Sequence, residues 1–152
     1  MTRSVVHDTF VIKRTYPASP ARVFAAFGDA AIKSQWFGEP GGSSTPHELD
    51  FRVGGRESLR GQIPTGPSFT YDALYHDIVD GERIIYSYEM TMDGRRISVS
   101  VATIELAAEG DGTRFTLTQQ GAFLDGLDTN AIREEGTNEM LDGLGRFLAE
   151  SP

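Results

Sequence analysis

Between Pro46 and Ala122 the sequence predicts an almost unbroken series of β-strands, and this series limits the folds open to the chain more than any other feature. Segments rich in β-branched and aromatic residues alternate there with short breaks of Gly, Pro and Asp, a spacing typical of antiparallel strands joined by tight turns. The Asp-Gly pairs at 80–81 and 93–94 are strong signals for two-residue hairpin turns. The predicted strands are 47–53, 56–63, 68–79, 82–92, 95–108 and 113–122.

The segment that follows has the periodicity of one long amphipathic helix, with Asp128 or Thr129 as its cap. Apolar or small residues recur there every three or four positions, at Ile132, Gly136, Met140, Leu144 and Phe147 or Leu148. Such a helix needs an apolar surface of similar length, and the predicted sheet is the only one in the chain. We therefore expect a curved antiparallel sheet to wrap around this C-terminal helix.

The N-terminal part completes the order of elements. Residues 7–16 read as a first strand, because β-branched and aromatic types dominate up to Pro17. Ser19-Pro20 then opens a short helix that ends at Gly28-Asp29, and a second short helix is predicted for 30–36. Residues 38–46, rich in Gly and Pro, are predicted to be loop. The chain is thus expected to be a single α+β domain spanning residues 1–152, with about seven strands.

Composition excludes several classes of protein. The net charge of −8 is spread along the chain and repels phosphate backbones, so nucleic acid is not an expected partner. No stretch approaches the length of a membrane span or a secretion signal, so we expect a cytoplasmic protein without membrane insertion. The absence of cysteine excludes disulfides and thiolate chemistry.

The motifs of common enzyme chemistry are also missing. The three histidines lie in separate predicted elements without metal-ligand spacing, so no metal site is predicted. There is no nucleophile elbow, no Walker loop and no dinucleotide fingerprint, and therefore no cofactor is expected.

A set of short motifs, in this order and spacing, resembles the START/Bet v 1-like (SRPBCC) superfamily. The branch that the chain resembles most is the C-terminal domain of activator of heat shock protein 90 ATPase homologues, over nearly the whole length. The motifs lie at residues 10–14, 20–24, 36–37, 51–56, 71–77, 81–86, 119–125 and 133–136. The resemblance implies a helix-grip fold. The chain departs from the family at Thr137, where the family usually has tryptophan, so the shape of any cavity is not inferred from relatives.

A sheet that curves around a helix leaves an enclosed space, and such spaces usually bind apolar molecules. Period-two alternation puts Tyr71 and Tyr75 on one strand face and Tyr86 and Tyr88 on one face of the next, while Gln119 shares a face with apolar neighbours. The alternative is that these tyrosines only fill the core. The predicted ligand-binding residues are Trp36, Phe51, Tyr71, Tyr75, Tyr86, Tyr88, Gln119, Phe123, Gly136 and Met140.

Three functions follow as hypotheses. The first is a binding protein for a small hydrophobic molecule such as a lipid or polyketide-like compound, without catalytic residues. The second is a cyclase or hydratase acting in the same cavity, with Glu89 as general acid or base if its carboxylate faces inward; the alternative for Glu89 is a surface ion pair. The resemblance implies the third, a co-chaperone that binds a chaperone. A separate accessory role in the stress response has no feature of the sequence behind it. Exposed strand edges also allow a homodimer.

Overall fold

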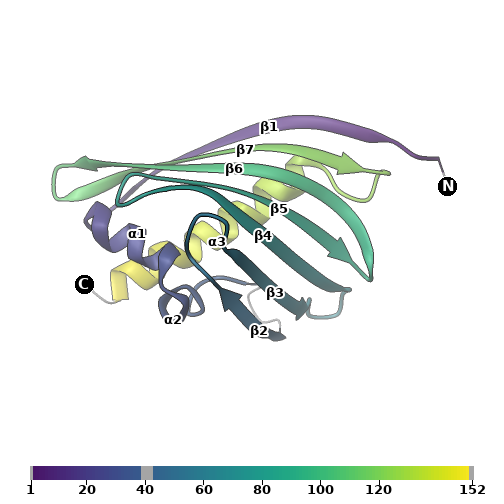
Figure 1. Cartoon of the computed structure of the whole chain (residues 1–152), viewed down its shortest axis with the longest axis horizontal. Helices are drawn as coiled ribbons and strands as arrows, with labels where there is room; N and C mark the ends of the chain where they lie inside the picture. The colour runs from purple at the N-terminus through teal and green to yellow at the C-terminus, as the bar shows by residue number, and fades with distance from the viewer. Residues whose placement is uncertain (1, 39–42, 151–152) are drawn as a thin grey trace.

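The computed structural model describes residues 2–38 and 43–150, with the backbone alone for residues 43–46. One antiparallel sheet of seven strands has the spatial order β1-β7-β6-β5-β4-β3-β2. Figure 1 shows this sheet bending around a long helix, α3, with two short helices at one end. The strands are β1 Val5–Tyr16, β2 Ser43–Leu49, β3 Arg56–Gln62, β4 Ser68–Val79, β5 Arg83–Met92, β6 Arg95–Glu109 and β7 Gly112–Leu124; the helices are α1 Pro20–Gly28, α2 Ala30–Lys33 and α3 Asn130–Glu150. The predicted α+β helix-grip fold is confirmed.

The hairpins from β3 to β7 form where the sequence predicts them. At the β5–β6 turn both Asp93 and Gly94 have positive φ, +49° and +79°, as a type I′ turn requires. Consecutive strands from β2 to β7 pair in chain order, and β1 closes the far edge against β7. Because β1 and the edge strand β2 are joined through α1 and α2, the two short helices span one open end of the curved sheet (Figure 1).

Side chains of β1 hold α3 in place on the concave face. The guanidinium of Arg14 donates to Asp142 Oδ1 at 2.6 Å and to Asn138 Oδ1 at 2.8 Å. The Tyr16 hydroxyl donates to the carbonyl of Leu141 at 2.9 Å and is buried. These contacts tie the second half of the helix to one edge of the sheet.

The core is divided into two apolar clusters. The larger one contains Phe115, Ile104 and the α1 residue Val23, and the C-terminal half of α3 packs into it through Leu144 and Leu148. The smaller one lies on strands β3 to β6, with Leu59, Phe69, Tyr71 and Met90 among its members. The smaller cluster therefore gathers on the strands far from the packed end of α3.

The predicted apolar stripe of α3 is only partly correct. Ile132 is 51% exposed and Met140 is half-buried, whereas the fully buried residues are Leu141, Leu144 and Leu148. The first half of the helix contacts the sheet through polar side chains such as Asn138 and Arg133, and its inward residues Gly136 and Met140 border open space instead of core. The stripe also shifts by one position, to Leu141, where close packing begins.

Two predicted boundaries near the second strand are wrong. Strand β2 begins at Ser43 and ends at Leu49, so residues 43–46 are strand and residues 50–53 are not; residues 39–42 of the predicted loop lie outside the described residues. Asp50 to Gly55 instead form a turn in which Arg52 N donates to Asp50 O and Gly55 N to Arg52 O. A Cβ on Gly55 would lie 2.0 Å from Asp50 O, so this turn requires glycine there.

Helix α2 is shorter than predicted, ending at Lys33 instead of Trp36. Residues 34–36 continue as a turn, and the Trp36 indole Nε1 donates to the carbonyl of Ala26 at 3.0 Å. The indole packs edge-on against Phe27, with ring centroids 5.0 Å apart. The turn thus seats the tryptophan at the junction of α1, α2 and the sheet.

Candidate functional site

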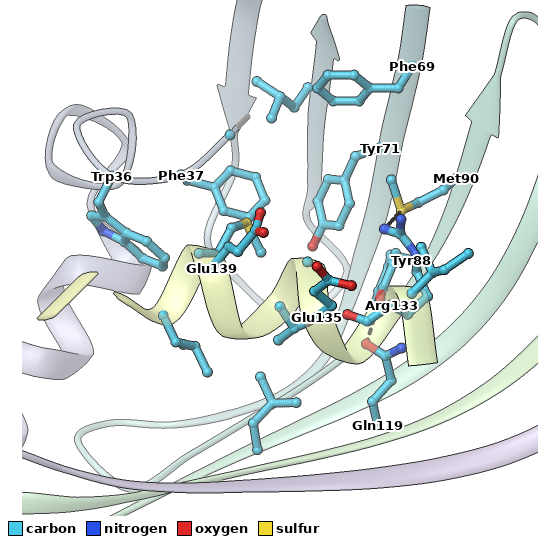
Figure 2. A pocket seen from close by; sticks show the side chains of 18 of the residues that line it. Trp36, Phe37, Phe69, Tyr71, Tyr88, Met90, Gln119, Arg133, Glu135 and Glu139 are labelled. Atoms are coloured by element: carbon cyan, nitrogen blue, oxygen red, sulfur yellow. Dashed lines mark hydrogen bonds between the residues drawn. The ribbon is translucent and has the colours of Figure 1, made fainter. Parts of the chain in front are cut away.

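A cavity of about 380 Å³ lies between the sheet and the N-terminal half of α3. Figure 2 shows Tyr71 and Phe37 on one side of the helix, Trp36 at one end, and Tyr88, Met90 and Gln119 at the other. The strands contribute apolar and aromatic side chains to its wall, namely Leu59, Phe69, Tyr71, Tyr86, Tyr88, Met90, Met92 and Leu117. Ile63, just after β3, and the aromatic residues Phe27, Trp36 and Phe37 add to this apolar lining. The cavity is therefore predominantly apolar, with the sheet on one side and α3 on the other.

Seven of the ten predicted ligand-binding residues line this cavity: Trp36, Tyr71, Tyr86, Tyr88, Gln119, Gly136 and Met140. The remaining three lie elsewhere. Phe51 packs against Phe24 and Tyr75, with ring centroids 5.6 and 5.1 Å away, in the larger core cluster. Tyr75 points its hydroxyl at Glu57. Phe123 faces inward but its ring covers Gly121, where an added Cβ would meet it at 2.7 Å.

The four tyrosines of β4 and β5 lie side by side, as their spacing predicts. Ring centroids are 5.0 Å apart for Tyr71 and Tyr88, 5.7 Å for Tyr75 and Tyr86, and 6.0 Å for Tyr86 and Tyr88. Burial raises the pKa of Tyr88 to about 12, against the opposing effect of the Arg133 guanidinium, and burial raises the pKa of Tyr71 and Tyr86 further. All three phenols that line the cavity are therefore neutral at physiological pH.

Gly136 leaves room in the cavity. A Cβ built there would meet no atom of the described structure within 4 Å, so close packing of the helix does not require glycine. Thr137, which stands where the family usually has tryptophan, also lines the cavity, and its hydroxyl donates to the carbonyl of Arg133 at 2.7 Å. Two small residues in succession keep the helix side of the cavity open.

Gln119 is the polar group that reaches the cavity from β7. It is 2% exposed, and its Oε1 accepts a hydrogen bond from the Tyr88 hydroxyl at 2.5 Å. Its Nε2 is buried and has no hydrogen-bond partner among the described residues. Gln120 faces solvent on the other side of the strand, as predicted.

Glu89 does not enter the cavity. Its carboxylate lies 3.2 Å from Arg96 Nε, and both side chains are exposed. This is the surface ion pair that period-two alternation allowed as the alternative. An inward general acid at this position is therefore excluded.

Charged residues form part of the cavity wall that the prediction missed. Arg133 lies 2.9 Å from the buried carboxylate of Asp128 through its Nε, and one Nη contacts Met90 Sδ at 2.8 Å. Glu135 and Glu139 border the cavity from exposed positions on α3. Arg133 and Glu135 belong to the family motif at residues 133–136, which is the signal that could have identified them; Glu139 looks like an ordinary surface residue in the sequence.

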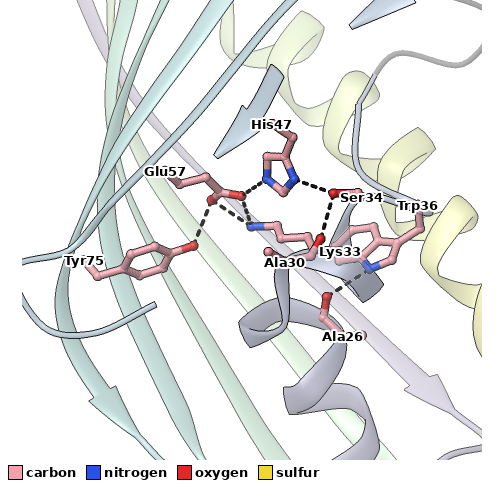
Figure 3. Close-up of polar contacts among 8 residues, drawn as sticks. All are labelled: Ala26, Ala30, Lys33, Ser34, Trp36, His47, Glu57 and Tyr75. Carbon is pink, nitrogen blue, oxygen red and sulfur yellow. Dashed lines mark hydrogen bonds and ion pairs between the residues drawn. The ribbon is translucent and has the colours of Figure 1, made fainter. Parts of the chain in front are cut away.

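Lys33 also lines the cavity and belongs to a buried polar network (Figure 3). Its ammonium lies 2.8 Å from both carboxylate oxygens of Glu57, which also accepts from the Tyr75 hydroxyl at 2.8 Å. His47 Nε2 lies 2.8 Å from Glu57, and its Nδ1 lies 2.8 Å from the Ser34 hydroxyl. Burial alone would raise the pKa of Glu57, but the Lys33 charge and the hydrogen bonds outweigh it and lower that pKa.

This network fixes the wall near Trp36. It joins α2 to strands β2, β3 and β4, and the Lys33 ammonium also lies 4.4 Å from the centre of the Phe37 ring. Since Lys33 is held by a carboxylate and an aromatic face, its charge is compensated at the cavity surface.

Neither a metal-binding cluster nor a membrane-spanning helix occurs in the part of the chain that the structure describes. No three or more His, Cys, Asp or Glu side chains of residues 2–38 and 43–150 come together in a group that could hold a metal ion. No helix in the described part of the chain is both long enough and apolar enough to cross a membrane.

The comparisons with known proteins agree with this architecture. The Mll3558 protein from Rhizobium loti is 46% identical, with 95% of this chain and 99% of that chain covered and a TM-score of 0.86. A putative uncharacterized protein from Rhizobium leguminosarum is 41% identical, with 99% and 100% covered and a TM-score of 0.94. The CV1439 protein from Chromobacterium violaceum is 25% identical, with 92% and 96% covered and a TM-score of 0.79. None of the curated proteins matches the chain.

The family profile described as "Activator of Hsp90 ATPase homolog 1-like protein" matches residues 17–149. That range runs from the end of β1 to the end of α3 and contains every residue that lines the cavity. The chain therefore belongs to this family, and through it to the START/Bet v 1-like helix-grip superfamily.

Proposed function

We propose that the protein binds a small hydrophobic molecule in the cavity between the sheet and α3. The observation that carries the proposal is the cavity itself: about 380 Å³, lined mainly by aromatic and aliphatic side chains. Ligand sites for small molecules typically have volumes of roughly 300–1,000 Å³ and an apolar lining with a few polar groups. A molecule of two or three fused rings, or a short acyl chain, fits these dimensions.

The absence of a steric reason for glycine at 136 supports the proposal. Glycine in the middle of a helix costs about 1 kcal/mol relative to alanine. No atom of the described residues would touch a Cβ at that position. Space for a bound molecule would explain the glycine at this position, whereas packing of the protein does not.

The lining offers little for catalysis. The cavity tyrosines are neutral at physiological pH, and Lys33 and Arg133 are both paired with carboxylates. General acid–base catalysis is most effective when the pKa of the group lies near the working pH, which these phenols do not satisfy. Binding without turnover is therefore the function that the site supports best.

Native mass spectrometry of the purified protein, followed by thermal unfolding against a panel of lipids and aromatic metabolites, tests the proposal. We expect a co-purified small molecule or a ligand that raises the melting temperature. The Gly136→Trp variant should lose this ligand while unfolding at a temperature close to that of wild type, because the indole enters open space.

The matched control is Ala131→Trp, an exposed position of the same helix that does not line the cavity. This variant should retain the ligand. Equal binding by wild type and Gly136→Trp would contradict the proposal, because the ligand would then lie outside the cavity. Capture of the host chaperone by both variants, with no ligand found, would favour the co-chaperone function instead.

A further inference from the structure

One end of the cavity has a buried hydrogen-bond donor for which the described residues provide no acceptor. The Gln119 amide is oriented by the Tyr88 hydroxyl, which donates to its Oε1. The other half of the amide, Nε2, is buried without a partner among the described residues and belongs to a side chain on the cavity wall. Since leaving a buried donor unpaired is costly, this group is suited to a ligand that brings an acceptor.

The charges around the cavity indicate which kind of acceptor fits. Arg133 is paired with Asp128 at 2.9 Å, and Lys33 with Glu57 at 2.8 Å, so neither cation is uncompensated. Glu135 and Glu139 border the cavity with no cation within ion-pair distance in the described part of the chain. A carboxylate on the ligand would therefore enter a region of net negative charge, on a protein whose net charge is already −8.

The arrangement of side chains at the Gln119 end of the cavity indicates how a ligand would be oriented. Figure 2 places Gln119, Tyr88, Met90 and Arg133 together at one end of the cavity, with Phe37 and Phe69 away from it. Tyr71 and Tyr88 lie 5.0 Å apart with planes tilted by 36°, and together they form an aromatic wall. A flat molecule packed against this wall can direct an oxygen at the Gln119 amide.

We propose that the ligand is a neutral, flat aromatic or polycyclic compound with a carbonyl-type oxygen, and that this oxygen accepts a hydrogen bond from Gln119 Nε2. This inference rests on the proposed function. Gln119 thus selects a ligand with an acceptor oxygen, the aromatic wall selects the flat ring system, and the acidic residues of α3 disfavour carboxylates.

Three probes of matched shape separate these features. 2-Acetylnaphthalene carries the neutral carbonyl, 2-isopropenylnaphthalene replaces its oxygen with CH₂, and 2-naphthoate replaces the acetyl group with a carboxylate. Equilibrium dialysis gives the dissociation constant of each. We expect the ketone to bind about tenfold more tightly than the hydrocarbon, as one buried hydrogen bond provides, and more tightly than the carboxylate.

Variants identify the donor. Because removing Gln119 would free the Tyr88 hydroxyl to donate to the ketone, the comparison is made between Tyr88→Phe and the double variant Tyr88→Phe/Gln119→Met. The ketone preference should persist in Tyr88→Phe and fall to near unity in the double variant. Gln120→Met, on the solvent face of the same strand, is the control and should keep the preference of wild type.

The outcomes are distinct. Equal binding of ketone and hydrocarbon would overturn the assignment of Gln119 and leave the proposed function standing. Tightest binding of 2-naphthoate would overturn the inference of a neutral ligand. Binding of none of the three probes would overturn this inference, and failure of the whole ligand panel as well would remove the proposed function itself.

Discussion

Removing one member of the buried Lys33–Glu57 pair should destabilise the protein far more than removing both. The two side chains are 4% and 0% exposed, and the ammonium contacts both carboxylate oxygens at 2.8 Å. In Lys33→Met the Glu57 carboxylate stays buried without its cation; in Glu57→Gln the ammonium stays buried without its anion. Breaking a buried pair in this way costs about 3–5 kcal/mol.

The double variant Lys33→Met/Glu57→Gln leaves no buried charge. Its glutamine retains an oxygen that can accept from the Tyr75 hydroxyl, which donates to Glu57 at 2.8 Å in wild type. We therefore expect the double variant to lose about 2 kcal/mol or less, so the coupling energy between the two sites exceeds about 3 kcal/mol.

Urea unfolding at neutral pH, followed by circular dichroism, measures the four free energies of this cycle. A domain of this size is stable by about 5–15 kcal/mol, so each single variant should lower the melting temperature by about 10 °C or more. Additive effects of the two substitutions on the unfolding free energy, or single variants within about 1 kcal/mol of wild type, would refute the view that the two buried charges stabilise each other.

Alanine substitutions at two neighbouring residues of α3 test where along the helix the packed core begins. Leu141→Ala should cost about 3 kcal/mol of unfolding free energy because Leu141, although it borders the cavity, is fully buried in the larger core cluster. Met140→Ala should cost less than about 1 kcal/mol because Met140 is only half-buried, and equal losses would contradict this boundary. Acid sensitivity follows from Glu57, whose pKa is lowered on folding: its contribution to stability is present above its ordinary pKa of 4.5 and disappears as the pH falls through the lower folded-state value. Wild type should therefore lose stability below about pH 4.5 more steeply than Glu57→Gln, and parallel stability curves would contradict the pairing.

The order of elements could be predicted because each depends on local pattern. The Asp-Gly turns, the Ser19-Pro20 helix start and the period-two alternation of β4 and β5 are properties of neighbouring residues, and the structure agrees with them. The side-by-side placement of the tyrosines followed from the same alternation once two strands were paired.

The boundaries that were missed depend on contacts distant in sequence. The turn at Asp50–Gly55 is held by exchange of hydrogen bonds with Tyr75, as Gly54 N donates to Tyr75 O and Tyr75 N to Gly55 O. Periodicity along α3 also could not show where the helix becomes fully buried, because Met140 and Leu141 are both apolar and both line the cavity, although only Leu141 is buried.

The charged part of the cavity wall could not be predicted because it also depends on contacts between residues distant in sequence. Lys33 and Glu57 lie 24 positions apart, on a short helix and a strand, and each alone resembles a surface residue. Phe51 was assigned to the cavity by residue type and Tyr75 by the strand face that it shares with Tyr71, but their packing against each other places both in the larger core cluster. Residue type indicated the chemistry of the lining, and only the fold separated lining from core.

The methionines provide the most direct test that the cavity receives a small molecule. Of the four in the chain, Met90, Met92 and Met140 line the cavity, and the fourth is the initial residue. We expect titration of methyl-labelled protein with 2-acetylnaphthalene to shift all three cavity methyl signals with a single dissociation constant, and to give nuclear Overhauser contacts between each methyl and the naphthalene ring. Unshifted cavity methyls at saturating probe, or contacts to surface residues alone, would contradict the central claim.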